Sequence, residues 1–128
     1  MKAILDTAIF LWWISDHSRF SSKAKQYLTD PTSEPLVSAA SLWEIKVKTA
    51  AGQLHLPEPV DRFLSKQLSE NAFHVLPIES RHVLALWHLP EHHQDPFDRM
   101  LIAQSQVENI PIVTADPQLS AYEVSILW

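Results

Sequence analysis

Short, continuously apolar stretches alternate along the chain with longer segments in which apolar residues recur at helical spacing. We expect a strand from the first kind and an amphipathic helix from the second. The apolar stretches lie at residues 3–5, 35–38, 74–78, 110–114 and 124–127. Strands of this kind are typical of a parallel sheet that is buried on both sides. The pattern therefore predicts an α/β fold with a short central parallel sheet and helices on both faces.

The helical segments connect these strands. They are expected at residues 7–14, 23–28, 42–51, 59–72, 80–89 and 96–108. Gly52 is expected to end the third helix. The first helix is apolar nearly all round, so Trp12 and Trp13 are expected mostly in the core, with one face left for a partner. Four apolar residues of the segment 80–89 are predicted to face the core: Val83, Leu84, Leu86 and Trp87.

Length and composition are those of one ordinary folded domain over residues 1–128. Apolar residues make up 46% of the 128 positions, and charged residues 20%. No apolar stretch is long enough for a membrane span, and none resembles a signal peptide. The absence of cysteine excludes disulfides and thiolate metal sites and fits a reducing cytoplasm. The formal charge of -5 does not favour binding to nucleic acid unless bound metal supplies positive charge.

Acidic residues stand where the predicted strands end. Asp6 ends the first strand, and Asp116 follows the strand over 110–114. Glu44 and Asp98 each lie in the first turn of a predicted helix. Because ligands of open α/β sheets bind beyond the carboxyl ends of the strands, we expect these acids to meet at one edge. Close carboxylates repel one another, and one or two Mg²⁺ or Mn²⁺ ions would relieve that repulsion and support hydrolysis of a phosphodiester.

The same acids also occupy positions that favour helix capping. Ser41 and Glu44 are spaced as a capping box. Asp6, Asp98 and Asp116 each lie at the start of a helix or turn, where a carboxylate stabilises free backbone N–H groups. If capping were their whole role, the protein would be a catalytically silent interaction module. This is the alternative function.

Four segments, in order, resemble the signature of the PIN-domain family, and more narrowly the VapC-type toxins of bacterial toxin–antitoxin pairs. They are residues 4–7 (ILDT), 42–45 (LWEI), 93–104 (HQDPFDRMLIAQ) and 113–116 (VTAD). The third segment, with the fourth at its distance, is the most specific part, and the resemblance extends over nearly the whole chain. One departure is Ala8, where members of this subgroup often carry His. It removes a possible substrate contact and no carboxylate.

The resemblance implies a metal-dependent endoribonuclease that forms a homodimer and is silenced by a VapB-type antitoxin. It implies that the acids matching the family motifs bind Mg²⁺ or Mn²⁺ and drive RNA cleavage: Asp6, Glu44, Asp98 and Asp116. Thr7 and Thr114 would hydrogen-bond these carboxylates or a phosphate. No membrane association is expected.

Further charged residues near these acids have two interpretations each. Asp95, directly before a proline, is favoured as a helix cap over a metal ligand. Arg99 either neutralises the acids or contacts RNA phosphate, or it forms a plain ion pair with Asp95 or Glu91. Lys46 and Lys48 either steer RNA toward the acids or form a solvated helix face.

Three histidines, His88, His92 and His93, leave a zinc-dependent hydrolase as a third hypothesis. His88 and His92 are four residues apart, but Pro90 lies between them and breaks a helix. A histidine-containing loop beside a helix cap is therefore favoured over a zinc site.

Overall fold

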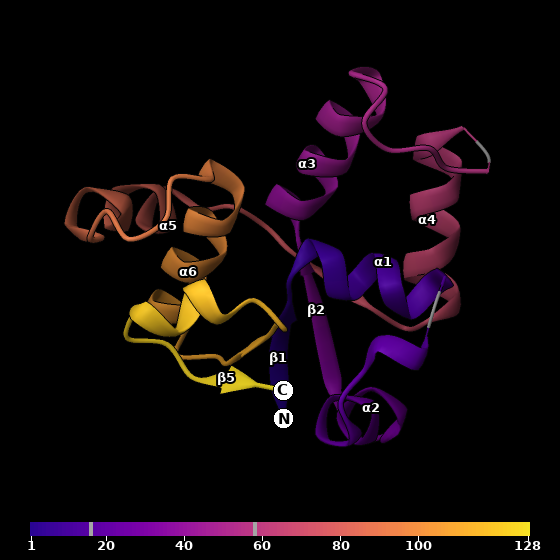
Figure 1. Cartoon of the computed structure of the whole chain (residues 1–128), viewed down its shortest axis with the longest axis horizontal. Helices are drawn as coiled ribbons and strands as arrows, with labels where there is room; N and C mark the ends of the chain where they lie inside the picture. Colours follow the sequence, from indigo (N-terminus) through magenta and orange to yellow (C-terminus); the bar gives the residue numbers. More distant parts are fainter. Residues whose placement is uncertain (16, 58) are drawn as a thin grey trace.

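Five short strands form one parallel sheet in the centre of the molecule (Figure 1). The structure, a computed structural model, describes residues 1–15, 17–57 and 59–128. The strands are β1 (Lys2–Leu5), β2 (Glu34–Ser38), β3 (His74–Leu76), β4 (Ile112–Val113) and β5 (Ile126–Leu127). Their order in the sheet is β3-β2-β1-β4-β5. The predicted α/β fold with a short parallel sheet is confirmed.

Helices cover both faces of this sheet. In the described part of the chain they are α1 (Thr7–Ser15), η1 (His17–Arg19), α2 (Ser22–Thr29), α3 (Ala39–Ala50), α4 (Val60–Glu70), α5 (Ser80–Ala85), η2 (Leu86–His88), α6 (Pro96–Glu108) and η3 (Pro117–Ala121). Helices α1, α2 and α4 share a core with Ala3 and Leu5 of β1. Ile4, which points to the opposite face, packs with Leu101 of α6. None of the helices in the described ranges is long and apolar enough to cross a membrane.

Strands β3, β4 and β5 are shorter than the apolar stretches that predict them, whereas β1 and β2 each begin one residue earlier than predicted. Strand β3 ends at Leu76, directly before Pro77, and β4 begins at Ile112, directly after Pro111. Proline has no backbone N–H to donate to a neighbouring strand, so it limits pairing at both places. The apolar pattern thus predicts where each strand lies, and the prolines fix how far it extends.

Helix α3 begins earlier than predicted, at Ala39 instead of residue 42. The last residue of β2, Ser38, is also the N-cap of α3, and its hydroxyl accepts a hydrogen bond from the N–H of Ala40 at 3.0 Å. The capping box predicted for Ser41 and Glu44 is therefore wrong, and Glu44 lies in the second turn. The end of the helix is as predicted, because Gly52 follows it with a φ of 73°.

The segment 80–89 differs most from its prediction. Its last turn is the 3₁₀ helix η2, since Leu89 is extended before Pro90. The side that α5 turns toward α6 contains His82, which is completely buried. Of the apolar residues, Leu86 packs against the core. The others predicted to face inward are exposed instead: Val83, Leu84 and Trp87.

Trp12 and Trp13 of α1 are partly buried and pack against the main apolar core. The ring of Trp12 meets Trp128 edge-on, and the ring of Trp13 meets Phe20 in the same way. The prediction that both lie mostly in the core is confirmed. That one face of α1 is left for a partner stays a prediction.

Candidate functional site

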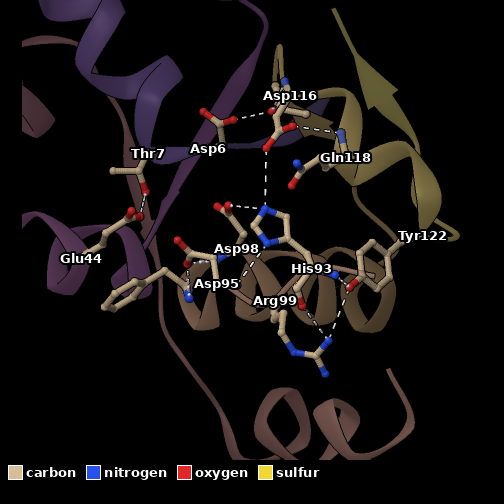
Figure 2. A network of polar contacts seen from close by, with 12 residues as sticks. Asp6, Thr7, Glu44, His93, Asp95, Asp98, Arg99, Asp116, Gln118 and Tyr122 are labelled. Carbon is tan, nitrogen blue, oxygen red and sulfur yellow. Dashed lines mark hydrogen bonds and ion pairs between the residues drawn. The ribbon is translucent and has the colours of Figure 1, made fainter. Parts of the chain in front are cut away.

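The four acids predicted to meet do line one cavity, at the carboxyl edge of the sheet. Strand order reverses at β1, which has β2 on one side and β4 on the other, so a crevice opens beyond the ends of β1 and β4. Asp6 follows β1 and Asp116 follows β4, while Glu44 reaches the cavity from α3 and Asp98 from α6. The cavity has a volume of about 520 Å³. Figure 2 shows these side chains around one space.

Asp6 is held by hydrogen bonds to both of its carboxylate oxygens. The N–H of Ile9 donates to Oδ1 at 2.7 Å, and the hydroxyl of Thr114 donates to Oδ2. The same threonine oxygen accepts a hydrogen bond from the N–H of Asp116 at 3.0 Å. Thr114 therefore connects the two acids that follow β1 and β4. The prediction that Thr114 hydrogen-bonds a carboxylate is confirmed.

Glu44 is buried and has two polar partners. The hydroxyl of Thr7 donates to its Oε1 at 2.6 Å, and the ammonium of Lys48 lies 2.5 Å from its Oε2. Thr7 Oγ1 also lies 2.9 Å from Ser41 Oγ. Because Thr7 has one hydroxyl proton and gives it to the carboxylate, Ser41 is the donor in that second contact. The Glu44 carboxylate is thus fixed in place before any ligand arrives.

His93 lies between Asp98 and Asp116, and Figure 2 shows its ring at the centre of the site. Its Nε2 is 3.1 Å from Asp98 Oδ2 and 3.7 Å from Asp116 Oδ2. The other ring nitrogen, Nδ1, accepts a hydrogen bond from the N–H of Asp95 at 3.1 Å. Since Nδ1 is an acceptor, the proton of the neutral ring is on Nε2, facing the two carboxylates.

Burial and mutual repulsion make two of these acids unusually weak. Burial, together with the weaker repulsion from the carboxylates of Asp116 and Glu44, raises the pKa of Asp6 to about 6, although the hydrogen bonds it accepts lower the pKa in part. Burial likewise raises the pKa of Asp98 to about 7, with Asp95 and Glu44 as the strongest repelling neighbours. For Lys48 the charged form is favoured instead, because its hydrogen bond to Glu44 raises its pKa.

Three acids that line the cavity also cap a helix or turn: Asp6, Asp95 and Asp116. Asp6 caps the start of α1 through Oδ1, and Asp116 caps η3 through Oδ1, which accepts from the N–H of Gln118 at 2.9 Å. Asp95 caps α6 through Oδ1, as predicted, with the N–H groups of Phe97 and Asp98 as donors. For Asp6 and Asp116, the second oxygen lies toward the other polar groups of the site. A cap therefore occupies one oxygen of each of these carboxylates, while the other oxygen contacts a side chain of the site.

Arg99 does not line the cavity of the acids, so of its interpretations the one in which it neutralises them has no geometric support. Its guanidinium donates to the carbonyl of Pro90 at 2.8 Å and reaches those of Leu89 and His93 at 3.4 and 3.3 Å. Glu91 is at 3.9 Å, the long limit of an ion pair. Unpaired carbonyls of the 89–95 loop attract the guanidinium more closely than the carboxylates do, so Arg99 ties that loop to α6.

The three histidines considered as a zinc site are not brought together. Only His93 faces the acids. The ring of His92 stands edge-on against Tyr122, with ring centroids 5.1 Å apart, and His88 is exposed at the end of η2. The loop conformation set by Pro90 separates them. A zinc site built from these three histidines therefore has no geometric support in the described residues.

Lys48 and His93 make contacts with the acids of the site that the sequence analysis did not predict. Lys48 is four residues after Glu44, which places both on one side of a helix, and this spacing is a usable signal for their contact. Lys46 is exposed. For His93, the sequence indicates a histidine-rich loop but gives no sign of its contact with Asp116, which is 23 positions away. That contact depends on how β4 lies beside β1.

Several solved toxin–antitoxin complexes contain a chain with the same fold. VapBC2 of Rickettsia felis, solved bound to a DNA fragment from its promoter, has a chain 15% identical to this one, with 98% of this chain and 97% of that chain covered and a TM-score of 0.73. FitAcB of Neisseria gonorrhoeae is 16% identical, covers 100% and 97%, and has a TM-score of 0.67. VapBC-5 of Mycobacterium tuberculosis is 17% identical, covers 98% and 97%, and has a TM-score of 0.64. Identities this low show the fold alone.

A comparison with family models shows the family of this chain, which the structural similarity does not. The family model described as the PIN domain matches residues 3–124, which include all four acids of the cavity. No curated protein matches the sequence. The family match extends over nearly the whole chain and agrees with the observed parallel sheet. This chain belongs to the PIN-domain family.

Proposed function

We propose that this protein is a divalent-metal-dependent endoribonuclease of the VapC toxin type. One observation carries the proposal: four acids from four separate elements, Asp6, Glu44, Asp98 and Asp116, line one cavity. Asp95 lines it as well, and Lys48 is the cationic residue among those that line it. Five carboxylates facing one ammonium leave an excess of negative charge that favours a bound cation. PIN-domain proteins are typically nucleases, and this arrangement suits that chemistry.

The donor set fits Mg²⁺ or Mn²⁺. Both ions prefer carboxylate and water oxygens, and the cavity presents carboxylates without any thiolate. The raised pKa values of Asp6 and Asp98 are a second sign, because these are the groups whose charge a cation would stabilise. We infer that Asp6, Asp98 and Asp116 hold the ion or ions, with Glu44 as a fourth ligand or as the group that orients the attacking water.

The chemistry then divides among the residues of the cavity. When bound, the metal polarises the scissile phosphate and lowers the pKa of a water molecule. Glu44, fixed by Thr7 and Lys48, is suited to orient that water and accept its proton. The ammonium of Lys48 limits repulsion between the acids and an approaching phosphate. Thr114 keeps the Asp6 carboxylate in one orientation.

The toxin proposal extends to partners. The solved complexes with the same fold are toxin–antitoxin complexes, which supports a VapB-type antitoxin as the cognate inhibitor. RNA is proposed as the substrate because the four acids suit the nuclease chemistry typical of PIN domains. We also propose a homodimer, because Leu84 and Trp87 expose large apolar side chains on α5 and η2, 62% and 75% of which face solvent. A molar mass in solution equal to one chain, for the protein without antitoxin, would contradict the dimer.

The silent interaction module keeps one observation in its favour, since Asp6, Asp95 and Asp116 do cap helices or turns. Asp98 and Glu44 argue against it. In the described residues, their carboxylates contact side chains of the site and not helix N–H groups. Capping does not explain why these two acids are turned toward the cavity.

RNA cleavage by the purified chain tests the proposal. With Mg²⁺ or Mn²⁺ present, the protein should cleave RNA, and EDTA should stop the reaction. Asp6→Asn and Asp98→Asn should each lower the rate by roughly 1,000-fold, equal to about 4 kcal/mol of transition-state stabilisation. Asparagine keeps the size of the side chain and the Oδ1 acceptor that caps α1. Thermal unfolding should therefore remain cooperative in both variants.

Glu70→Gln is the matched control, because Glu70 is an exposed acid at the end of α4, outside the cavity. It should leave cleavage unchanged. Full RNA cleavage by both Asp6→Asn and Asp98→Asn would refute the assignment of the site. A chain that neither cleaves RNA nor gains thermal stability from Mn²⁺ would favour the silent interaction module.

A further inference from the structure

We propose that His93 is a positioning residue for the site: its Nε2–H orients the Asp98 carboxylate for the divalent cation. This inference rests on the proposed function. It begins from the place of the imidazole, which lies between Asp98 and Asp116 with Nε2 at 3.1 and 3.7 Å from one oxygen of each. Those three atoms lie close enough to one another to form a metal site themselves. His93 could therefore act either as a hydrogen-bond donor to the two carboxylates or as a metal ligand beside them.

The hydrogen bond at the other ring nitrogen, Nδ1, decides between these two roles. Nδ1 accepts from the N–H of Asp95, so the neutral imidazole has its proton on Nε2. A ligating nitrogen needs a free lone pair, and ligation through Nε2 would move the proton to Nδ1, where it would face the N–H of Asp95. The ring is thus built to donate toward the carboxylates and not to coordinate a metal.

The loop that carries His93 is anchored at several points, which fixes the ring before any ligand binds. The backbone N–H of His93 donates to the hydroxyl of Tyr122 at 2.7 Å, and its carbonyl accepts from Arg99. Arg99 also binds the carbonyls of Leu89 and Pro90, and the His93 side chain is 14% exposed. This anchoring explains what Arg99 does without contacting the acids: it sets the position of the loop.

The consequence for Asp98 is a fixed orientation. Its Oδ2 is turned toward His93, which leaves Oδ1 for the cavity. Groups that hydrogen-bond a ligating side chain typically contribute about 10–100-fold to metal affinity or activity, because they remove the freedom of the ligand to rotate. His93 has this relation to Asp98, and a weaker one to Asp116.

The test compares Mn²⁺ affinity, measured by calorimetry, among single variants of the full chain. His93→Leu keeps bulk but removes the donor, and should weaken Mn²⁺ binding by about 10–100-fold. His93→Gln restores an N–H donor near the position of Nε2 and should recover most of the loss, together with RNA cleavage. His92→Leu is the matched control, since His92 stands against Tyr122 outside the cavity, and it should bind Mn²⁺ like wild type.

A spectroscopic measurement does not depend on any variant folding. The ¹⁵N chemical shifts of the His93 ring in the metal-free wild type should identify the tautomer with the proton on Nε2. The tautomer with the proton on Nδ1 would overturn the proposal. So would Mn²⁺ binding by His93→Leu that is as tight as, or tighter than, that of a wild type which binds Mn²⁺ and cleaves RNA. A wild type that does neither overturns the proposed function, and this inference with it.

Discussion

Two regions of the molecule gather carboxylates around a histidine, and they differ in how the negative charge is balanced. At the cavity, His93 contacts Asp98 and Asp116, and three more acids and Lys48 line the walls. At the junction of α5 and α6, His82 is completely buried and its Nε2 lies 3.0 Å from Glu108 Oε1. We call this second group, Glu79, Arg81, His82 and Glu108, the α5–α6 cluster.

The α5–α6 cluster is complete without a ligand. Arg81 contacts Glu79 at 2.9 Å and also binds Glu108. His82 Nδ1 accepts from the backbone N–H of Glu79 at 2.9 Å, so its Nε2–H donates to Glu108. The guanidinium occupies the place between the two glutamates that a cation would need. The three potential ligands in this cluster therefore connect two helices and need no metal.

The comparison teaches that acids and a histidine in proximity do not by themselves indicate a metal site. What distinguishes the cavity is that its acids are buried together without enough cations to balance them: burial first, and then repulsion between the carboxylates, raises the pKa of Asp6 to about 6 and that of Asp98 to about 7. Its polar groups restrain the acids without neutralising them. In the α5–α6 cluster, an arginine performs the neutralisation. Removing an acid should consequently have opposite effects on stability in the two regions.

The largest effect on stability is expected in the α5–α6 cluster. Glu108→Ala leaves the buried Nε2–H of His82 without its close acceptor, and an unsatisfied buried donor costs about 1–3 kcal/mol. Urea unfolding should show a lower midpoint and a free energy of unfolding that is smaller by that amount. Glu123→Ala is the control, because Glu123 is exposed. Equal stability of Glu108→Ala and wild type would mean that the cluster is not the structural connection described above.

A smaller change of opposite sign is expected in the cavity. Asp98→Asn removes a charge that burial and neighbouring acids disfavour, so at about pH 8 without metal the variant should be more stable by on the order of 1 kcal/mol. Urea unfolding in the presence of EDTA measures this. A lower midpoint for Asp98→Asn would indicate that the charged carboxylate stabilises α6, as the capping interpretation predicts.

The most gradual effect is the pH dependence of the metal-free wild type. The pKa values of Asp6 and Asp98 are raised in the folded state, so the folded chain binds more protons than the unfolded chain above the ordinary value of 3.8. The stability from this source is fully present below that value and is lost as the pH rises through about 6 and 7. Unfolding free energies across this range should therefore decrease, with a weaker decrease in Asp98→Asn. A free energy that rises over the same range would contradict the direction of both shifts.

Much of the site could be predicted from the sequence because the relevant signals are local. An apolar run that ends in an acid, such as residues 3–6, indicates both a strand and the edge where its acid lies. The Asp95-Pro96 pair fixes the start of α6, which begins at Pro96 as predicted. Locality also explains the failures. The start of α3 depended on Ser38 serving both strand and helix, and the direction that α5 faces depended on a hydrogen bond to Glu108, which is 26 positions from His82.

The sequence by itself determined the alternation of strands and helices, the four acids at strand or helix ends, and the cap at Asp95, because each depends on residues a few positions apart. Only the tertiary structure decided which polar group each carboxylate oxygen contacts, that His93 stands between Asp98 and Asp116, and that Arg99 lies against a loop. These contacts join segments that are distant along the chain. Their geometry follows from how β1 and β4 pair and how α6 packs on the sheet, which no local pattern encodes.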